Sequence, residues 1–167
     1  QPWIEWALAS QKENGYFGPD TDRPYEYGLQ RDNSHDWWPK MVVLKVLKQH
    51  YDATGDERVI PFMLKYFKYQ LEELPKTPLG HWTYWGAQRG GDNLYVVYWL
   101  YSLTGESWLL ELGDLIAKQT AGFTGADLSN LLNEAAILAA REDRPVLSMR
   151  DINDAMMKIL AGPEKRS

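Results

Sequence analysis

The spacing of apolar residues predicts helices of two kinds in the first two thirds of the chain. From Val59 to Leu74, apolar residues recur at three-and-four spacing, the pattern of a helix that buries one stripe. From Asp92 to Leu103, nearly every position is apolar, as in a helix that packs on several sides. The stretch from Trp37 to Tyr51 is similarly rich in apolar residues. We therefore expect an outer helix at 59–74 and inner helices at 37–51 and 92–103.

A repeat with a period of 50 residues joins these helices into hairpins. Tyr51–Ile60 matches Tyr101–Leu110, and each copy contains Thr-Gly followed by an acidic residue. Glycine tolerates the left-handed conformation that ends a helix, so each copy predicts the turn of a helical hairpin. Hairpins repeated at such a period stack into an open solenoid or a closed toroid. The expected fold class is all-α, with stacked hairpins that form part of an α/α toroid.

The aromatic residues divide the chain into two stretches. Of its 22 Trp, Tyr and Phe residues, only Phe123 lies after residue 120. From Gly125 onward the sequence turns to alanine, leucine and asparagine, and its alanine and leucine favour helix without large aromatic side chains. No Gly/Ser or Pro linker marks the change, which falls inside the helix-like run 107–120. This is an unusual place for a domain boundary.

Charge and composition narrow the possible partners. The net charge of −5 is spread along the chain without a basic block, so we expect no nucleic acid partner. No apolar run is long enough to span a bilayer and no charged and apolar leader opens the chain, so we expect a soluble protein without a recognisable targeting segment. The sequence contains no cysteine, which excludes disulfides, thiolate zinc sites and a cysteine nucleophile. The cellular compartment stays undetermined.

Two long stretches between the helices, 12–33 and 75–91, are rich in Gly, Pro and Tyr. Long connections in a compact domain are usually functional. In the second one, Trp82, Tyr84 and Trp85 either form a floor on which a sugar stacks or cap the hydrophobic core.

The first part of the chain contains three characteristic motifs, Gln11–Phe17, Ser34–Trp38 and Tyr51–Gly55. With these motifs, residues 1–118 resemble glycoside hydrolase family 127. The resemblance implies part of an (α/α)6 barrel whose inner loops hold a sugar pocket, in a family of β-L-arabinofuranosidases. An arabinose-type sugar is the ligand that it implies.

Carried over residue by residue, the resemblance places His35 and Asp36 at the substrate-facing histidine motif of that family. The family's second histidine motif is replaced here by residues 89–93, in which Asp92 and Asn93 would contact sugar hydroxyl groups. An Asp at this position also fits a simple helix cap. The candidate substrate-binding residues are therefore His35, Asp36, Trp82, Trp85, Asp92 and Asn93.

The resemblance also implies a mechanism that uses a cysteine nucleophile held on zinc and a glutamate acid/base. With no cysteine present, we assign no catalytic residue, no metal site and no cofactor. A carboxylate pair formed by Asp36 and Asp92 is the alternative, because glycosidases can work with two carboxyl groups across the sugar. Acidic residues at helix starts are common, and we expect no complete catalytic site.

The last part of the chain contains the motifs Ala121–Leu128, Asn133–Ala136 and Gly162–Glu164. With these motifs, residues 112–167 resemble the AAA+ lid subdomain of FtsH-type proteases. Ser/Thr-x-x-Asp starts at Thr124 and Ser148 predict helices at 125–141 and 149–160. By resemblance alone, Gly125 and Ala126 lie near a nucleotide. The chain has neither a Gly-x-x-x-x-Gly-Lys-Ser/Thr nor a His-Glu-x-x-His pattern, so we expect no ATP hydrolysis or proteolysis.

Residues 106–120 are read as one helix that both parts share. The leading hypothesis is a chimera, engineered or recombined, that was spliced at this helix into a scaffold without activity; a natural fusion is the alternative. Two other functions stay open. One is a sugar-binding remnant, and the other is an oligomerisation module that uses the tail. A homo-oligomer would cover the apolar edge of an open barrel.

Overall fold

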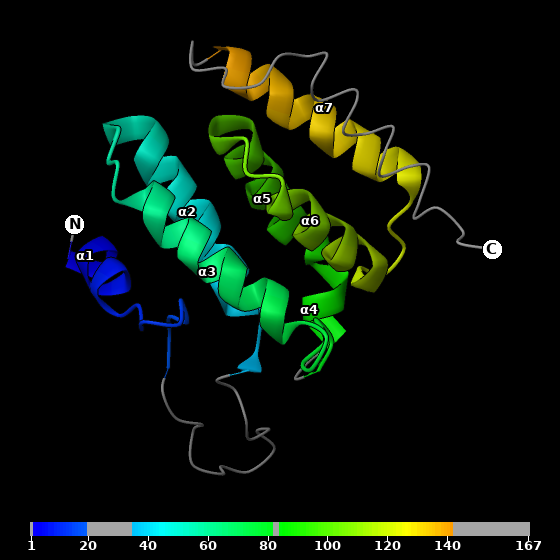
Figure 1. The fold of residues 1–167 in the computed structure, drawn as a ribbon, viewed down its shortest axis with the longest axis horizontal. Helices are drawn as coiled ribbons and strands as arrows, with labels where there is room; N and C mark the ends of the chain where they lie inside the picture. Colours follow the sequence, from blue (N-terminus) through cyan, green and yellow to red (C-terminus); the bar gives the residue numbers. More distant parts are fainter. Residues whose placement is uncertain (1, 20–34, 82–83, 142–167) are drawn as a thin grey trace.

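The computed structural model describes residues 2–19, 35–81 and 84–141, and the regular elements in these ranges are α-helices, without a strand (Figure 1). The predicted all-α fold is therefore confirmed. The helices are α1 (Pro2–Ala9), α2 (Trp38–Thr54), α3 (Val59–Glu73), α4 (Tyr84–Gln88), α5 (Gly90–Thr104), α6 (Trp108–Gln119) and α7 (Gly125–Arg141).

The two copies of the repeat form two hairpins, α2–α3 and α5–α6, as predicted. Gly55 and Gly105 follow α2 and α5 with φ of 68° and 70°, and each donates its backbone N–H to the carbonyl of the tyrosine four residues earlier. The left-handed conformation costs little without a Cβ, which explains why glycine stands at both turns.

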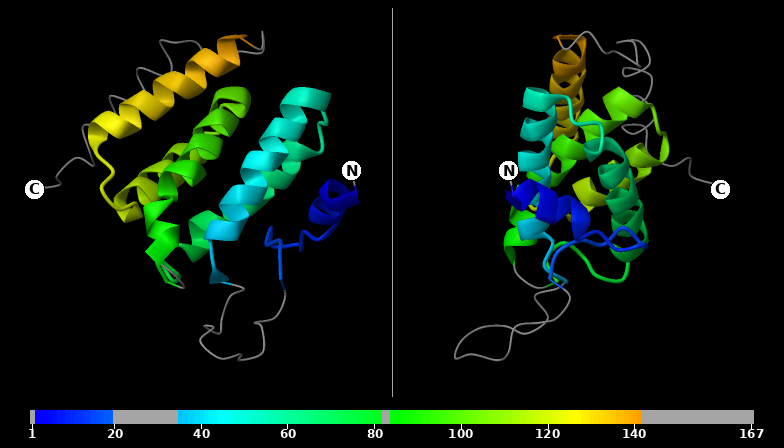
Figure 2. Two further views of the ribbon diagram at one scale, coloured as in Figure 1. Left: turned by 180° about the vertical axis from the view of Figure 1, so that it is seen from behind. Right: turned by 90° about the vertical axis from the view of Figure 1, so that its left-hand side faces the viewer.

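The helices lie in two layers, which the turned views separate (Figure 2). The layer of α2, α5 and α7, which is nearer the viewer in the left view of Figure 2, is called the front layer below. The layer of α3 and α6 is called the back layer. In the front layer α5 contacts α2 on one side and α7 on the other; in the back layer α3 contacts α6. Helix α5 also packs on α6 and α3, so it touches elements of both layers.

Burial follows the predicted patterns in α3 and α5 but not in α2. Helix α3 buries one stripe, and α5 buries the side chains from Leu94 to Ser102 apart from a partly exposed Tyr95. In contrast, α2 buries one face, while Val42 on another face is 53% exposed. Unlike α5, helix α2 is therefore not covered on several sides. Apolar content alone does not reveal on which sides a helix has neighbours.

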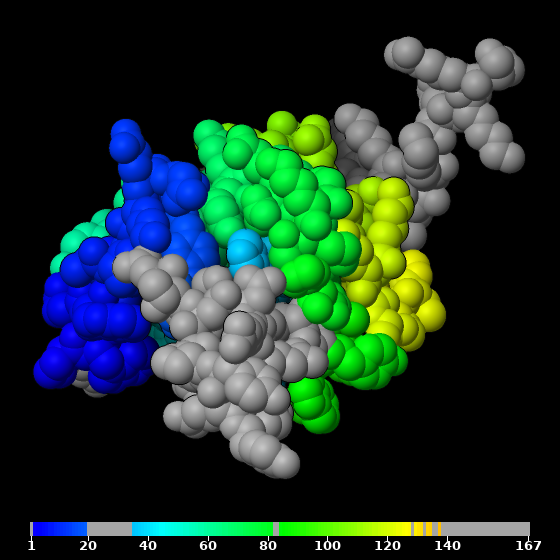
Figure 3. All heavy atoms as spheres, turned by 90° about the horizontal axis from the view of Figure 1, so that it is seen from below, coloured from blue at the N-terminus to red at the C-terminus, as the bar shows by residue number. Residues whose placement is uncertain are grey.

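The segment between α6 and α7 is tied to the first part of the chain. The Gln119 side-chain oxygen accepts a hydrogen bond from the Leu79 N–H at 2.9 Å, and the Ala121 N–H donates to the Ala87 carbonyl at 3.0 Å. Thr124 and Asp127 then pair reciprocally at the start of α7, as the sequence predicts. Seen from below, α1 (blue) and the residues that lead into α7 (yellow) lie at opposite sides of the molecule (Figure 3).

Close packing of α6 on α5 depends on Gly113. A Cβ on this residue would lie 2.5 Å from the Tyr98 hydroxyl oxygen. We expect Gly113→Ala to lower the free energy of unfolding by about 1–3 kcal/mol, because overpacking forces a buried ring out of place. Urea denaturation measures this. Gly91→Ala is the matched control, since its Cβ would meet nothing closer than 4.0 Å. Equal stability of the two variants would contradict the prediction.

Candidate functional site

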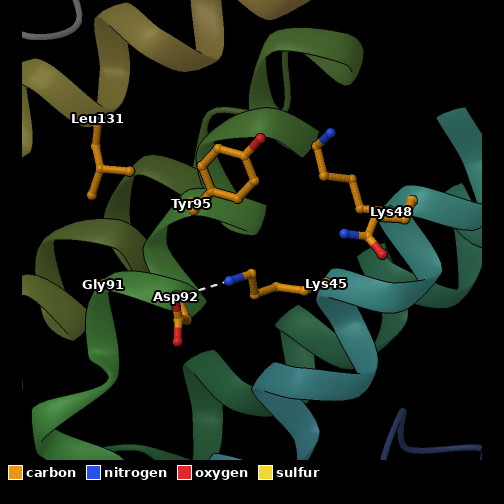
Figure 4. A pocket seen from close by; sticks show the side chains of 7 residues that line it. Lys45, Lys48, Gly91, Asp92, Tyr95 and Leu131 are labelled. Carbon is orange, nitrogen blue, oxygen red and sulfur yellow. Dashed lines mark hydrogen bonds and ion pairs between the residues drawn. The ribbon is translucent and has the colours of Figure 1, made fainter.

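A cavity of about 410 Å³ lies between α2, α5 and α7 (Figure 4). This volume falls in the range of small-molecule sites, about 300–1,000 Å³. Its lining is mostly polar and comes from both parts of the chain, because Leu131 belongs to α7. The lining residues are Lys45, Lys48, Gln49, Gly91, Asp92, Tyr95 and Leu131.

An ion pair between α2 and α5 crosses one side of the cavity. The Lys45 ammonium nitrogen lies 3.2 Å from the Asp92 carboxylate oxygen, and the two side chains are 43% and 37% exposed. Pairs this exposed stabilise a fold little, so both groups can exchange partners at low cost. The Asp92 side chain makes this pair and does not cap the start of α5.

Lys48, one turn further along α2, is held much more firmly. Its ammonium group lies 2.6 Å from Asp52, and its side chain is only 8% exposed. The same group lies over the rings of Tyr95 and Trp99, at 5.6 and 5.3 Å from their centres. Burial acts against the charge, but the hydrogen bond and charge of Asp52 outweigh it and raise the pKa of Lys48. The cavity therefore has one fixed cation.

Of the predicted substrate-binding residues, Asp92 lines this cavity and Asn93 does not. Asn93 is fully buried, and its side-chain amide exchanges two hydrogen bonds with that of Gln70, at 2.6 and 3.1 Å. This pair joins α5 to α3 inside the core. Both amides are thereby satisfied without water or ligand.

His35 and Asp36 precede α2, away from the residues that line the cavity. The His35 ring lies 6.3 Å from the His81 ring, edge to face. Asp36 is buried and accepts the Trp38 N–H at 3.1 Å. Burial raises the pKa of the Asp36 carboxyl, against the effects of that hydrogen bond and of the nearby Lys40 charge.

Lys40 is a second buried lysine on α2, and its pKa is shifted in the opposite direction to that of Lys48. It donates a hydrogen bond to the Asp36 backbone carbonyl at 3.0 Å and lies over the Tyr16 ring. Burial lowers the pKa of Lys40 to about 8, while the Asp36 charge acts in the opposite direction.

Trp85 lies on α4 and stacks on Trp38, with ring centres 5.7 Å apart and planes at 23°. It keeps 52% of its surface exposed, and the Arg89 guanidinium lies 5.9 Å from its ring centre. Trp38 packs against the hydrophobic core, and the Trp85 ring stacked on it stays half exposed. Trp82, the other candidate from this stretch, lies outside the described residues.

Gly125 and Ala126 are exposed at the start of α7. The described residues hold no group of three or more His, Cys, Asp or Glu side chains placed to share a metal ion. In these same ranges, no helix combines the length and the apolar content that crossing a membrane requires. The second predicted tail helix, 149–160, falls outside the described ranges.

Sequence reasoning missed the lysines, Gln49 and Tyr95 of the cavity. Lys45, Lys48 and Gln49 stand three and four residues apart and so share one face of α2. That spacing was the available signal, but charged residues on a helix usually mark a solvated face.

A family profile described as "Beta-L-arabinofuranosidase, GH127 catalytic domain" matches residues 1–130, more than three quarters of the chain. The chain belongs to glycoside hydrolase family 127. This confirms the resemblance of the first part, and the match covers α1 to α6 together with the start of α7.

A second profile, the AAA+ lid domain, matches residues 113–154. The two matches share residues 113–130, which include most of α6 and the start of α7. A chain of family 127 thus continues into a lid-like segment, and the composite organisation is confirmed.

Curated relatives of the lid-like segment are ATP-dependent zinc metalloproteases. FtsH 3 of Synechocystis sp. is 65% identical over 54 residues, 32% of this chain and 9% of the relative. FtsH of Caldicellulosiruptor bescii is 64% identical over 52 residues, 31% and 8% of the two chains. The chain therefore spans less than a tenth of the length of these relatives. No solved structure matches the chain.

The two buried lysines of α2 predict opposite responses to pH. A lysine in the unfolded chain has a pKa of 10.5, against about 8 for folded Lys40. Between these values the unfolded state binds more protons, so the free energy of unfolding rises with pH. We expect Lys40→Met to flatten this rise between about pH 8 and 9.5, measured by urea denaturation.

Lys48→Met is the control for that measurement. The raised pKa of Lys48 places its titration above this window, so this variant keeps the slope of the original protein while losing stability. A Lys40→Met variant with an unchanged slope would contradict the assignment.

Proposed function

We propose that the protein is a composite helical scaffold in which α7 takes the place of the next inner helix of an α/α toroid. The observation that carries this is the contact of α7 with α5 in the front layer, on the side opposite α2. In this proposal α2, α5 and α7 are inner helices and α3 and α6 are outer ones. The lid-like segment then covers an edge of α5.

The order of elements along the chain supports this role. Helix α5 enters the front layer after outer helix α3, and α7 enters the same layer after outer helix α6. Hydrogen bonds at Gln119 and Ala121 hold the connection against the first part. We attribute the arrangement to splicing of two helical proteins, by design or recombination, at the shared helix predicted at 106–120, which the structure forms as α6 (Trp108–Gln119). The domains proposed are residues 1–118 and 112–167.

The proposal includes no catalysis. The sequence contains no cysteine to serve as the family's nucleophile. The alternative carboxylate pair is also poorly supported, since Asp36 is buried against Trp38 and Asp92 is paired with Lys45.

The position of the tryptophans allows a direct test of the scaffold. All eight lie at or before residue 108, so tryptophan fluorescence reports on the first part alone, whereas far-ultraviolet circular dichroism reports on all helices. If α7 is an integral helix, the two probes give coincident thermal transitions, the test of one cooperative unit. A separate transition seen only by circular dichroism would contradict the proposal.

Leu131→Asp sharpens this test, because it places a charge on α7 where Leu131 packs against the core. Both probes should then show a lower melting temperature, while the exposed Asn130→Asp control leaves it unchanged. Light scattering at several protein concentrations checks that neither variant associates.

Carbohydrate binding is a second candidate function, which the Trp38–Trp85 stack favours. Half-exposed aromatic rings offer apolar faces with polar edges, which suits sugar rings. His35 lies three residues before Trp38, so the stack adjoins the position of the family's histidine motif.

We expect L-arabinose to raise the melting temperature of the protein and Trp85→Ala to abolish that rise. Trp6→Ala is the matched control, since Trp6 is a 64% exposed tryptophan on α1. An unchanged melting curve at high sugar concentration, or an equal response of the two variants, would exclude the site.

A further inference from the structure

We propose that the cavity between α2, α5 and α7 binds a small polyhydroxy carboxylate, the chemical class of the sugar acids. This site is separate from the Trp38–Trp85 stack and goes beyond the scaffold role. It rests on the lining of the cavity, whose charged groups differ in how firmly they are held.

The Lys45–Asp92 pair supplies an exchangeable cation and an exchangeable carboxylate. Figure 4 shows the Lys45 ammonium group directed toward Asp92 across the gap between the two helices. An ammonium group has three donor hydrogens, and one pair of this kind uses one of them. Lys45 can therefore donate to a ligand carboxylate, and the Asp92 carboxylate can accept from a ligand hydroxyl group.

Lys48 adds a positive charge that is held in a fixed position beside Asp52. Asp52 and the rings of Tyr95 and Trp99 hold it, so it contributes charge without having to be reoriented by a ligand. Gln49 on the same helix adds a side chain that both donates and accepts.

This lining discriminates between three classes of ligand. A simple anion satisfies Lys45 but is repelled by Asp92. A neutral polyol donates to Asp92 and accepts from the lysines, but without the charge of a carboxylate these bonds are weaker. A hydroxy acid satisfies both, because its carboxylate meets Lys45 while a hydroxyl group donates to Asp92. Its volume also suits a cavity of about 410 Å³.

Because Leu131 lies on α7, the complete site requires both matched segments. Leu131 is the apolar wall that α7 contributes, whereas the polar groups come from α2 and α5. A ligand in the cavity thus contacts residues of both matched segments, and neither segment alone supplies the whole lining.

Isothermal titration calorimetry on the full chain at constant ionic strength tests the site with three probes: D-glucuronate, D-glucose and acetate. We expect glucuronate to bind at least about tenfold more tightly than either other probe, the scale of one charge-assisted hydrogen bond. Lys45→Met should weaken glucuronate binding by about tenfold.

Lys118→Met is the matched control, because Lys118 also forms an exposed ion pair with an aspartate, Asp114, but on α6. It should bind glucuronate as the original protein does, with circular dichroism confirming that both variants fold. Absence of binding, equal affinity for acetate or for glucose, or equal binding by the two variants would overturn the proposal.

Discussion

The burial of α5 on nearly every side is the constraint on which the rest of the structure depends. Its side chains from Val96 to Leu100 are fully buried, and each apolar one stabilises the fold by about 1.5–3 kcal/mol. No single neighbour can cover a helix of this kind, so α2, α6 and α7 are all required. Small residues then decide how close they come: Gly113 admits the Tyr98 ring, and Gly90 admits Thr120.

Local pattern predicted the hairpins well because their turns depend on local chemistry. A glycine at each Thr-Gly step and a three-and-four apolar spacing determine a helix end and a buried stripe without reference to distant residues. The neighbours of α2 could not be predicted from local pattern. Its apolar content is compatible with burial on several sides, but the number of its faces that are covered depends on helices elsewhere in the chain.

The residues of the candidate site could be predicted only where the position of a residue on its helix determines which way its side chain points. Asp92 and Asn93 are adjacent, yet successive residues of an α-helix are rotated by about 100°, so one faces the cavity and the other the core. Lys40 and Lys48 are both buried lysines of α2, and their pKa values differ because burial dominates for Lys40, whereas the Asp52 carboxylate outweighs burial for Lys48. The Lys48–Asp52 spacing is local, but how deeply each lysine is buried depends on distant residues that no local spacing contains.

Helix α6 explains how one chain can match two families without a linker. Helix α6 packs on its neighbours through a buried stripe of Leu109, Leu112 and Ile116. Helices of unrelated proteins can present the same apolar stripe, so one helix can suit the packing of both families. Gln119 and Ala121 lie inside the region common to both matches, and they hydrogen-bond to Leu79 and Ala87 in the first part. Residues that both matches share thus tie the chain just before α7 to the first part, and α7, in contact with α5, gives the cavity its apolar wall.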